Sequence, residues 1–275
     1  CRQSCKNKGS KIMANAVAEK QATEVAPSNL SSLLEEEAGA GLENFTTEDM
    51  QIPFIRILQA LSPQLNKQDS MYIKGAEQGD IFNTVSQQVY KAEQGVTVVP
   101  CFFEKKFLEF ALRSSGGGFI RELASDDRDI ALTTREGAAE ILPSGNELVR
   151  THQHVVMAMD PETNMGAPAI LDMKKTQLKV SRRWNTLKNG IRLPSGKPMP
   201  LYGTAWNIQT IAESNDQGSW YNYKVERVYN ISKEIEAMML ESRTMYQSFR
   251  KGDIKTASAP ADEMQSAQKD EEIPF

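Results

Sequence analysis

The sequence has few cysteines, no long apolar run and no pattern for export. Its three cysteines, Cys1, Cys5 and Cys101, are odd in number and lack metal-ligand spacing, which argues against a disulfide framework and a zinc site. No stretch approaches the roughly 20 apolar residues that a membrane helix needs. We therefore expect a soluble cytoplasmic protein without membrane contact or cofactor, in which Cys101 lies in the core.

Acidic residues are also missing from one long stretch, between Met173 and Ala212. The whole chain carries a net charge of −4, so its charges are distributed unevenly. Such an asymmetry predicts a local site for a polyanion despite the acidic total. The cations of this stretch are Lys174, Lys175, Lys179, Arg182, Arg183, Lys188, Arg192 and Lys197.

Composition divides the chain into three parts. Residues 1–48 are expected to be a disordered N-terminal segment with a short acidic helix near residues 30–37, and we interpret residues 1–12 as lying upstream of a true start at Met13. Residues 49–252 are long enough for one folded domain. Residues 253–275 are rich in small and polar side chains, which predicts a disordered acidic tail.

Two helices and a hairpin are predicted in the second half of the domain. The first helix carries an apolar stripe, ends at Gly190 and exposes a cationic face to solvent. The second begins after an N-cap at Ser232 and ends at Gly252. Between them, residues 201–213 and 219–229 alternate as a hairpin. The stripe of the first helix consists of Val180, Trp184, Leu187 and Ile191.

The first half of the domain shows short strand patterns with turns about every ten residues, which predicts a β-rich α+β fold. Pro100 interrupts a β-rich run at residues 96–103 and indicates an edge or a bulge. Residues 107–112 are expected to form a separate strand that pairs with this run. Residues 122–147 are charged and contain Gly and Pro breaks, so we expect a peripheral insertion there.

A protein that binds single-stranded nucleic acid without reading its sequence needs cations beside aromatic platforms, and residues 174–229 supply both. Because alternate residues of a strand point to opposite faces, some of these rings must be core, and the sequence leaves open which. The candidate DNA contacts are Lys174, Lys175, Lys179, Arg182, Arg183, Lys188, Arg192, Trp206, Tyr221 and Tyr223.

The tail places an aromatic tip behind three acids, an arrangement suited to a hydrophobic pocket with a basic rim on a partner. This ending resembles the acidic tails of bacterial and phage single-stranded DNA-binding proteins. The resemblance implies single-stranded DNA as ligand and recruitment of replication or recombination proteins, and it favours an OB-like small barrel with insertions. The tail residues are Asp270, Glu271, Glu272, Ile273, Pro274 and Phe275.

A second resemblance covers part of the body. Residues 42–63 and 75–84 are similar to proteins of tailed phages that are often described as DNA-binding. This similarity implies a role in replication or recombination of a phage genome. It assigns no individual site residue.

Two other functions are compatible with the sequence. Asp160, Asp172 and Lys174 are typical of a degenerate Mg²⁺-dependent nuclease motif, in which two acids hold the metal and the lysine positions water. A protein–protein adaptor that does not bind DNA would also explain the tail. His152 and His154 share a strand face and could hold a metal only with a third ligand. We therefore expect a non-catalytic protein without a bound metal, and homo-oligomer formation stays open.

Overall fold

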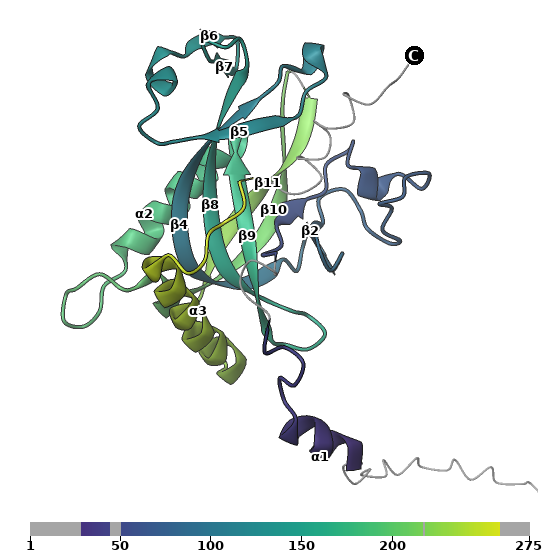
Figure 1. Cartoon of the computed structure of the whole chain (residues 1–275), viewed down its shortest axis with the longest axis vertical. Coiled ribbons are helices and arrows are strands. Elements are labelled where there is room, and N and C mark those ends of the chain that lie inside the picture. Colours follow the sequence, from purple (N-terminus) through teal and green to yellow (C-terminus); the bar gives the residue numbers. More distant parts are fainter. Residues whose placement is uncertain (1–28, 45–50, 217, 259–275) are drawn as a thin grey trace, which may run out of the picture. The chain divides into compact units, whose positions relative to one another are not determined.

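The computed structural model describes residues 29–44, 51–216 and 218–258. The chain separates into two units, residues 1–46 and residues 47–275. In the first unit, helix α1 (Asn29–Glu36) lies where the short acidic helix is predicted. The second unit is a β-rich α+β fold built on a curved, half-barrel sheet (Figure 1).

The second unit contains eleven strands and two α-helices within the described residues. In chain order they are β1 (Ile55–Ile57), β2 (Ile81–Asn83), β3 (Val89–Tyr90), β4 (Val96–Phe110), β5 (Phe119–Leu123), β6 (Thr134–Glu136), β7 (Ala139–Ile141), β8 (Glu147–Met159), β9 (Gly166–Lys174), α2 (Leu178–Gly190), β10 (Ala205–Asn215), β11 (Gly218–Val228) and α3 (Lys233–Lys251).

Five long antiparallel strands form a Greek key. β4, β8 and β9 pair in sequence, α2 follows, and β10 then returns to the free edge of β4 with β11 beside it. A five-stranded, partly open Greek-key barrel is the architecture of OB-folds. Strands β5 to β7 form an excursion between β4 and β8, at the place of the predicted insertion. The predicted β-rich, OB-like small barrel with insertions is confirmed.

The segment around β1 occupies the gap between the two ends of this curved sheet. Its chain forms an isolated parallel bridge with β9. On the other side, the hydroxyl of Tyr223 on β11 donates to the carbonyl of Ile55 over 3.1 Å. The side-chain amide of Gln59 exchanges two hydrogen bonds with the backbone of Tyr221, at 2.9 and 3.0 Å. β1 therefore joins β9 to β11 and brings its own side chains to the end of the barrel.

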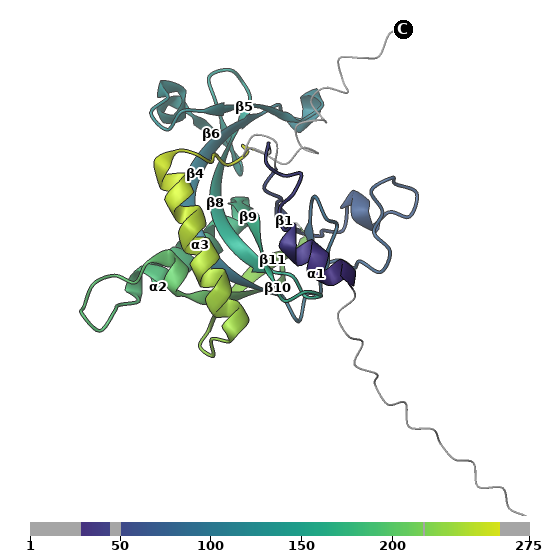
Figure 2. The same ribbon diagram turned by 60° about the horizontal axis from the view of Figure 1, so that its bottom comes forward.

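The two helices cover opposite faces of β8, because alternate residues of a strand point to opposite sides. His154 contacts Trp184 of α2, whereas Met157 packs with Met238 of α3. Trp184 is fully buried, as predicted, and its ring lies 6.0 Å from that of Trp206. Figure 2 shows α3 lying across β4 and β8. Burial of each large apolar side chain contributes about 1.5–3 kcal/mol to stability, so both helices are anchored to the sheet.

The long first strand, β4, differs from the expectation of two strands that pair with each other. Residues 107–110 continue β4 and pair with β5 and β8 instead. The predicted irregularity is confirmed, because the register shifts between Pro100 and Phe102. Proline has no N–H to give to the ladder, and the bulge bends the strand. One long bent strand can therefore serve as the neighbour of both β8 and β10.

The predicted helix ends and the hairpin are confirmed. α2 ends at Gly190, and the hydroxyl of Ser232 caps α3, which stops at Gly252 with a φ of +83°. β10 and β11 pair from Ala205–Val228 to Asn215–Gly218. The pairing therefore extends into residues 214–218, which were expected to form the loop. Leu187, expected on the buried stripe of α2, is 43% exposed.

The chain after α3 stays in contact with the body as far as Ser258. The side-chain amide of Gln153 donates to the carbonyl of Ala257 over 2.9 Å, and the hydroxyl of Ser258 donates to Glu122 over 2.6 Å. The contacts of the described chain after α3 therefore reach Ser258. No helix within the described residues is both long and apolar enough to span a membrane.

Gly95, directly before β4, lies where the chain passes very close to β10. Its φ is +68°, and a Cβ there would lie 2.4 Å from the carbonyl oxygen of Ile208 on β10. Gly196 has a similar φ of +79° but open space around it. We expect Gly196→Ala to cost about 1 kcal/mol from backbone strain, and Gly95→Ala to cost at least about 1–2 kcal/mol more. Urea unfolding of both variants measures the difference, and equal losses would contradict the close approach.

Candidate nucleic-acid interface

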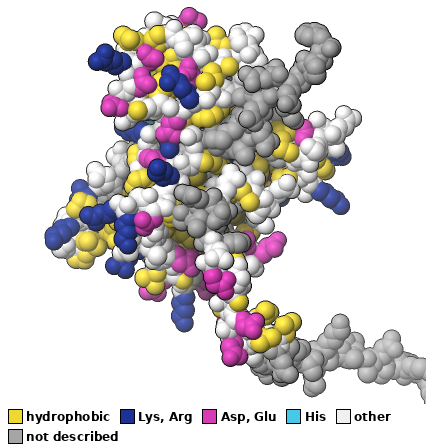
Figure 3. Space-filling view, viewed as in Figure 1, with side chains coloured by type: hydrophobic (Ala, Val, Ile, Leu, Met, Phe, Trp, Pro, Cys, Tyr) yellow, Lys and Arg dark blue, Asp and Glu magenta, His cyan; other side chains and the backbone are white. Residues whose placement is uncertain are grey.

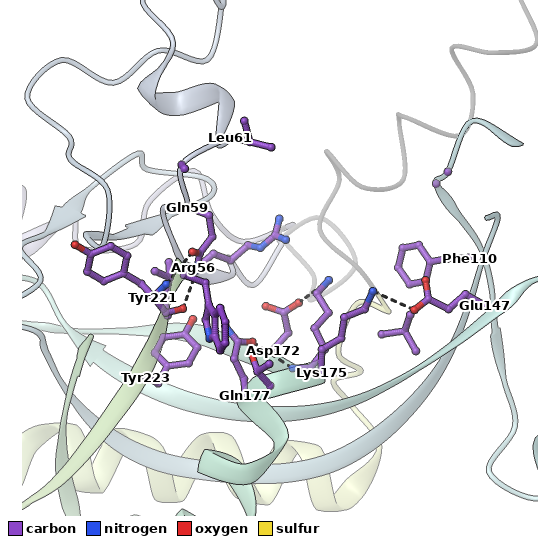
Figure 4. A pocket seen from close by; sticks show the side chains of 18 of the residues that line it. Arg56, Gln59, Leu61, Phe110, Glu147, Asp172, Lys175, Gln177, Tyr221 and Tyr223 are labelled. Carbon is purple, nitrogen blue, oxygen red and sulfur yellow. Dashed lines mark hydrogen bonds and ion pairs between the residues drawn. The ribbon is translucent and has the colours of Figure 1, made fainter. Parts of the chain in front are cut away.

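A cleft of about 960 Å³ opens where the end of β9, the start of β11 and the chain after β1 meet. The loop that follows β4 also borders it, through Ala111 and residues 116–118. In OB-folds, oligonucleotides bind on the second and third strands, between the loop after the first strand and the loop before the last strand. Figure 4 shows side chains from these separate segments turned toward one space. Its principal lining residues are Arg56, Gln59, Phe110, Gly116, Gly117, Gly118, Glu147, Asp172, Lys174, Lys175, Gln177, Trp220, Tyr221 and Tyr223.

Three cations and two carboxylates line this cleft, which leaves a local charge of +1 (3 − 2). Lys175 Nζ lies 3.0 Å from Glu147, and Lys174 Nζ lies 3.5 Å from Asp172. The ammonium of Lys174 also lies 5.7 Å from the ring centre of Phe110. The carboxylates hold the lysines in the cleft, where a phosphate can take over the same ammonium groups.

The backbone turn after β9 explains how two consecutive lysines reach one cleft. On a regular strand they would point to opposite faces. Lys175 instead has a φ of +53°, in the left-handed region, and begins a short 3₁₀ turn. The side chain of Gln177 accepts a hydrogen bond from the N–H of Lys174 over 3.2 Å and supports this turn. Such strained backbone positions cluster at functional sites.

Aromatic side chains line the same cleft. Phe110, Trp220 and Tyr221 are half-buried, so part of each ring is accessible. The indole N–H of Trp220 donates to Glu213 over 3.1 Å, which fixes the ring on β11. The cleft therefore combines cations with partly exposed rings from three separate parts of the chain.

Two of the three predicted stacking rings are core residues. Trp206 is 2% exposed, and its indole N–H donates to the hydroxyl of Thr204 over 2.9 Å. Tyr223 is also 2% exposed, and burial raises the pKa of its hydroxyl. Their positions on β10 and β11 face the barrel interior, so neither offers a ring face to a base. Tyr221 alone of the three has a partly accessible ring.

The cationic stretch of the sequence is divided among several places. Lys179 pairs with Glu213 over 2.8 Å, and its hydrogen bond lowers the pKa of that carboxyl group. Arg182 lines a second pocket beside α2. Arg183, Arg192 and Lys197 are exposed outside both pockets, and Figure 3 shows Lys and Arg side chains gathered over the α2 side of the molecule. Acids from other strands thus neutralise part of a stretch that has none of its own.

Lys188, expected on the solvent face of α2, is buried instead. Its ammonium lies 4.0 Å from the centre of the Trp184 ring and 3.2 Å from Nδ1 of His154. Burial lowers the pKa of Lys188 to about 7 and also holds the pKa of His154 well below its usual value. A cation that is costly to charge in this environment is unsuited to phosphate binding.

The two histidines share one strand face, as predicted, but they converge on a serine. Nδ1 of His152 lies 2.7 Å from the hydroxyl oxygen of Ser181, and Nε2 of His154 lies 2.8 Å from it. Among the described residues no group of three potential metal ligands comes together. These contacts tie β8 to α2.

The nuclease motif does not assemble in the structure. The carboxylate of Asp160 accepts hydrogen bonds from the N–H groups of Glu162 and Thr163 in the turn before β9, and these lower its pKa. Asp172 lies near the other end of β9, six residues beyond Gly166, or about 20 Å at the rise of an extended strand. The two acids therefore cannot hold one metal ion.

Sequence reasoning missed Arg56, Phe110 and Trp220. Arg56 enters the cleft from a segment without a charge cluster, and Phe110 enters it from the aromatic-rich end of β4, which lies far in sequence from the cationic stretch. Trp220 lies in the aromatic hairpin, but the direction of its ring depends on the barrel. The tail residues from Asp270 to Phe275 lie outside the described part of the chain.

The fold and the cleft define an OB-like barrel protein with a mixed cationic and aromatic groove. The model of the Pam3 phage gp34-like protein family matches residues 20–255, and the chain belongs to this phage protein family. No curated protein and no solved structure matches it significantly. The expected phage relationship is thereby confirmed at the level of the family.

The buried Lys188 predicts a distinctive dependence of stability on pH. Its pKa is about 7 in the folded protein and 10.5 for an ordinary lysine. Between these values the unfolded chain holds a proton that the folded chain has lost, so the free energy of unfolding should rise with pH, by a few kcal/mol over the window. Urea unfolding at several pH values measures it. Lys188→Met should remove the rise and the exposed Lys197→Met should keep it; a wild-type curve that is flat would contradict the burial of an ionisable amine.

Proposed function

We propose that this protein binds single-stranded DNA in the cleft, without catalysis, and protects unwound strands. The observation that carries the proposal is the meeting of Arg56, Lys174 and Lys175 with the rings of Phe110, Trp220 and Tyr221 in one groove. Single strands expose phosphates and unstacked base faces together, which is the pattern this groove complements. The resemblance of the tail to single-stranded DNA-binding proteins supports the same function.

Binding proceeds by exchange of partners within the groove. Phosphates replace Glu147 and Asp172 as partners of the two lysines, and released counterions favour the complex. Bases stack on the partly exposed rings, each contributing about 1–3 kcal/mol. Contacts of cations with phosphates and of rings with base faces carry no sequence information, so binding should tolerate any sequence. A duplex hides its base faces and should bind more weakly.

Trp220 provides a direct optical test of where DNA binds. The chain has three tryptophans, and Trp184 and Trp206 are buried in the core. Titration with poly-dT should therefore quench fluorescence from Trp220, and a duplex of equal length should quench it much less. Trp220→Phe should lose most of the quenching, which assigns the signal to the cleft. Equal affinity for duplex and single strand would contradict the proposal.

Variants of the cleft predict both affinity and salt dependence. Three cations predict a slope of log K against log salt of about −2, from about 0.7 per phosphate. The double variant Lys174→Gln with Lys175→Gln should make the slope shallower, with a magnitude below about 1, and should weaken binding at low salt. Trp220→Ala should cost about 1–3 kcal/mol at every salt concentration.

Matched controls keep the same chemistry outside the cleft. Lys197→Gln removes an exposed cation, and Tyr229→Ala removes a ring that is 80% exposed. Neither should change affinity by more than about twofold. If these controls weaken binding as much as the cleft variants, DNA binds elsewhere. If binding shows no salt dependence and no preference for single strands, a protein adaptor is the better account.

The acidic tail is proposed to recruit replication or recombination proteins, in the cytoplasm of the infected cell. In the absence of DNA, its carboxylates would compete with DNA for the cationic surface. Deletion of residues 270–275 should then tighten poly-dT binding at low salt and have little effect at high salt, as measured by the same titration. An unchanged affinity at low salt would contradict competition between the tail and DNA, but it would not contradict DNA binding in the cleft.

A further inference from the structure

A second pocket, of about 500 Å³, lies between α2 and the strands β4 and β8. Arg150 and His152 of β8 line this pocket, and Val149 of the same strand lines the cleft. Since alternate residues of a strand point to opposite faces, Arg150 and His152 lie on the opposite face of the sheet from Val149, whereas Thr151, which also lines the pocket, shares the face of Val149. The full lining is Lys105, Lys106, Phe107, Arg150, Thr151, His152, Arg182, Asn185 and Thr186.

This pocket differs from the cleft because no carboxylate lines it. Two of its cations nevertheless form ion pairs with carboxylates outside the lining. Lys106 lies 3.1 Å from Glu122, and Arg150 lies 2.8 Å from Glu140. Lys105 and Arg182 are exposed, and among the described residues neither has a carboxylate within ion-pair distance. Their positive charges face the same pocket without compensation from the part of the chain that the structure describes.

His152 lies close enough to Lys105 and Arg182 for both charges to affect its pKa. Lys105 is its direct neighbour across the β4–β8 ladder. Burial lowers the pKa of His152, and the charges of Lys105 and Arg182 lower it further. Its Nδ1 contacts Ser181, which leaves Nε2 as the nitrogen that can meet a ligand. The edge of the ring toward Phe103 is packed, with centroids 5.3 Å apart in a T-shaped arrangement.

We propose that this second pocket binds a phosphate group between Lys105, Arg182 and His152. The side-chain amide of Asn185 supplies a further donor, whereas the hydroxyl of Thr186 already donates to the carbonyl of Arg182 over 3.0 Å. Two cations and an imidazole N–H match the three acceptor oxygens of a phosphate. The proposal concerns a site separate from the cleft and does not depend on DNA binding there.

Binding of phosphate should depend on pH through His152. A bound phosphate anion offsets the repulsion from Lys105 and Arg182, so it raises the pKa of His152. The other titratable or charged groups that face this region are Lys106 and Glu104 from β4, Arg150 and His154 from β8, Lys188 from α2, and Glu122 and Glu140 from the insertion. Burial holds the pKa of His154 well below its usual value, and the charge of Lys188 lowers it further.

NMR of the imidazole side chains tests the site on the intact chain, which contains two histidines. Titration with inorganic phosphate, with chloride at equal ionic strength as reference, should shift the His152 resonances saturably and raise its pKa. Lys105→Gln with Arg182→Gln should weaken binding about tenfold or more, since hydrogen bonds to charged groups are strong. Arg183→Gln is the matched control, because this exposed neighbour on α2 does not line the pocket.

Three probes separate the sources of phosphate. Inorganic phosphate and thymidine 5′-monophosphate present a terminal group, while oligo-dT without a terminal phosphate presents diesters alone. A saturable His152 shift with any of them, lost in the double variant and kept in Arg183→Gln, supports the site and names its source. Absence of a shift with all three, or equal loss in Arg183→Gln, overturns it. The variant Lys174→Gln with Lys175→Gln should bind inorganic phosphate normally, so failure of the cleft and failure of this pocket are distinguishable.

Discussion

The antiparallel pairing of β4 with β8 is the interaction on which the rest of the structure depends. It runs from Val98–Ala158 to Phe110–Glu147 and is interrupted once, at the bulge beside Pro100. Because β4 is long and bent, β10 can join its other edge and complete the Greek key. The same ladder carries Phe110 and Glu147 to the cleft. Loss of this pairing would separate the two halves of the barrel, and neither pocket would form, because residues of β4 and β8 line both.

The alternation of side chains along β8 separates two kinds of cationic surface. On one face, lysines paired with carboxylates lie beside partly exposed rings. This arrangement suits the proposed single-stranded DNA, which carries both bases and phosphates. On the other face, Lys105 and Arg182 flank His152 without a carboxylate in the lining, which suits a phosphate alone.

Local signals in the sequence predicted the secondary structure well where capping and periodicity are strong. Ser232 and Gly252 delimit α3 because one accepts an N-terminal hydrogen bond and the other adopts a left-handed conformation, both of which are short-range requirements. The prediction of a separate strand at residues 107–112 was wrong, because a bulge and a turn look alike in a linear pattern. The site was predicted only in part. Lys174, Lys175 and Tyr221 reach the cleft, Tyr223 borders it with only 2% of its surface exposed, and Trp206 and Lys188 are buried outside it.

By itself, the sequence determined the β-rich class, the helices, the hairpin and the presence of a cationic, aromatic region, because these follow from local periodicity and composition. Only the tertiary structure decided which cations remain uncompensated and which rings are accessible. Glu147 and Glu213 neutralise lysines that lie far from them in the chain, and Arg56 enters the cleft from a strand that the barrel brings alongside β9 and β11. Burial and charge pairing are properties of neighbours in space, and strand order sets those neighbours.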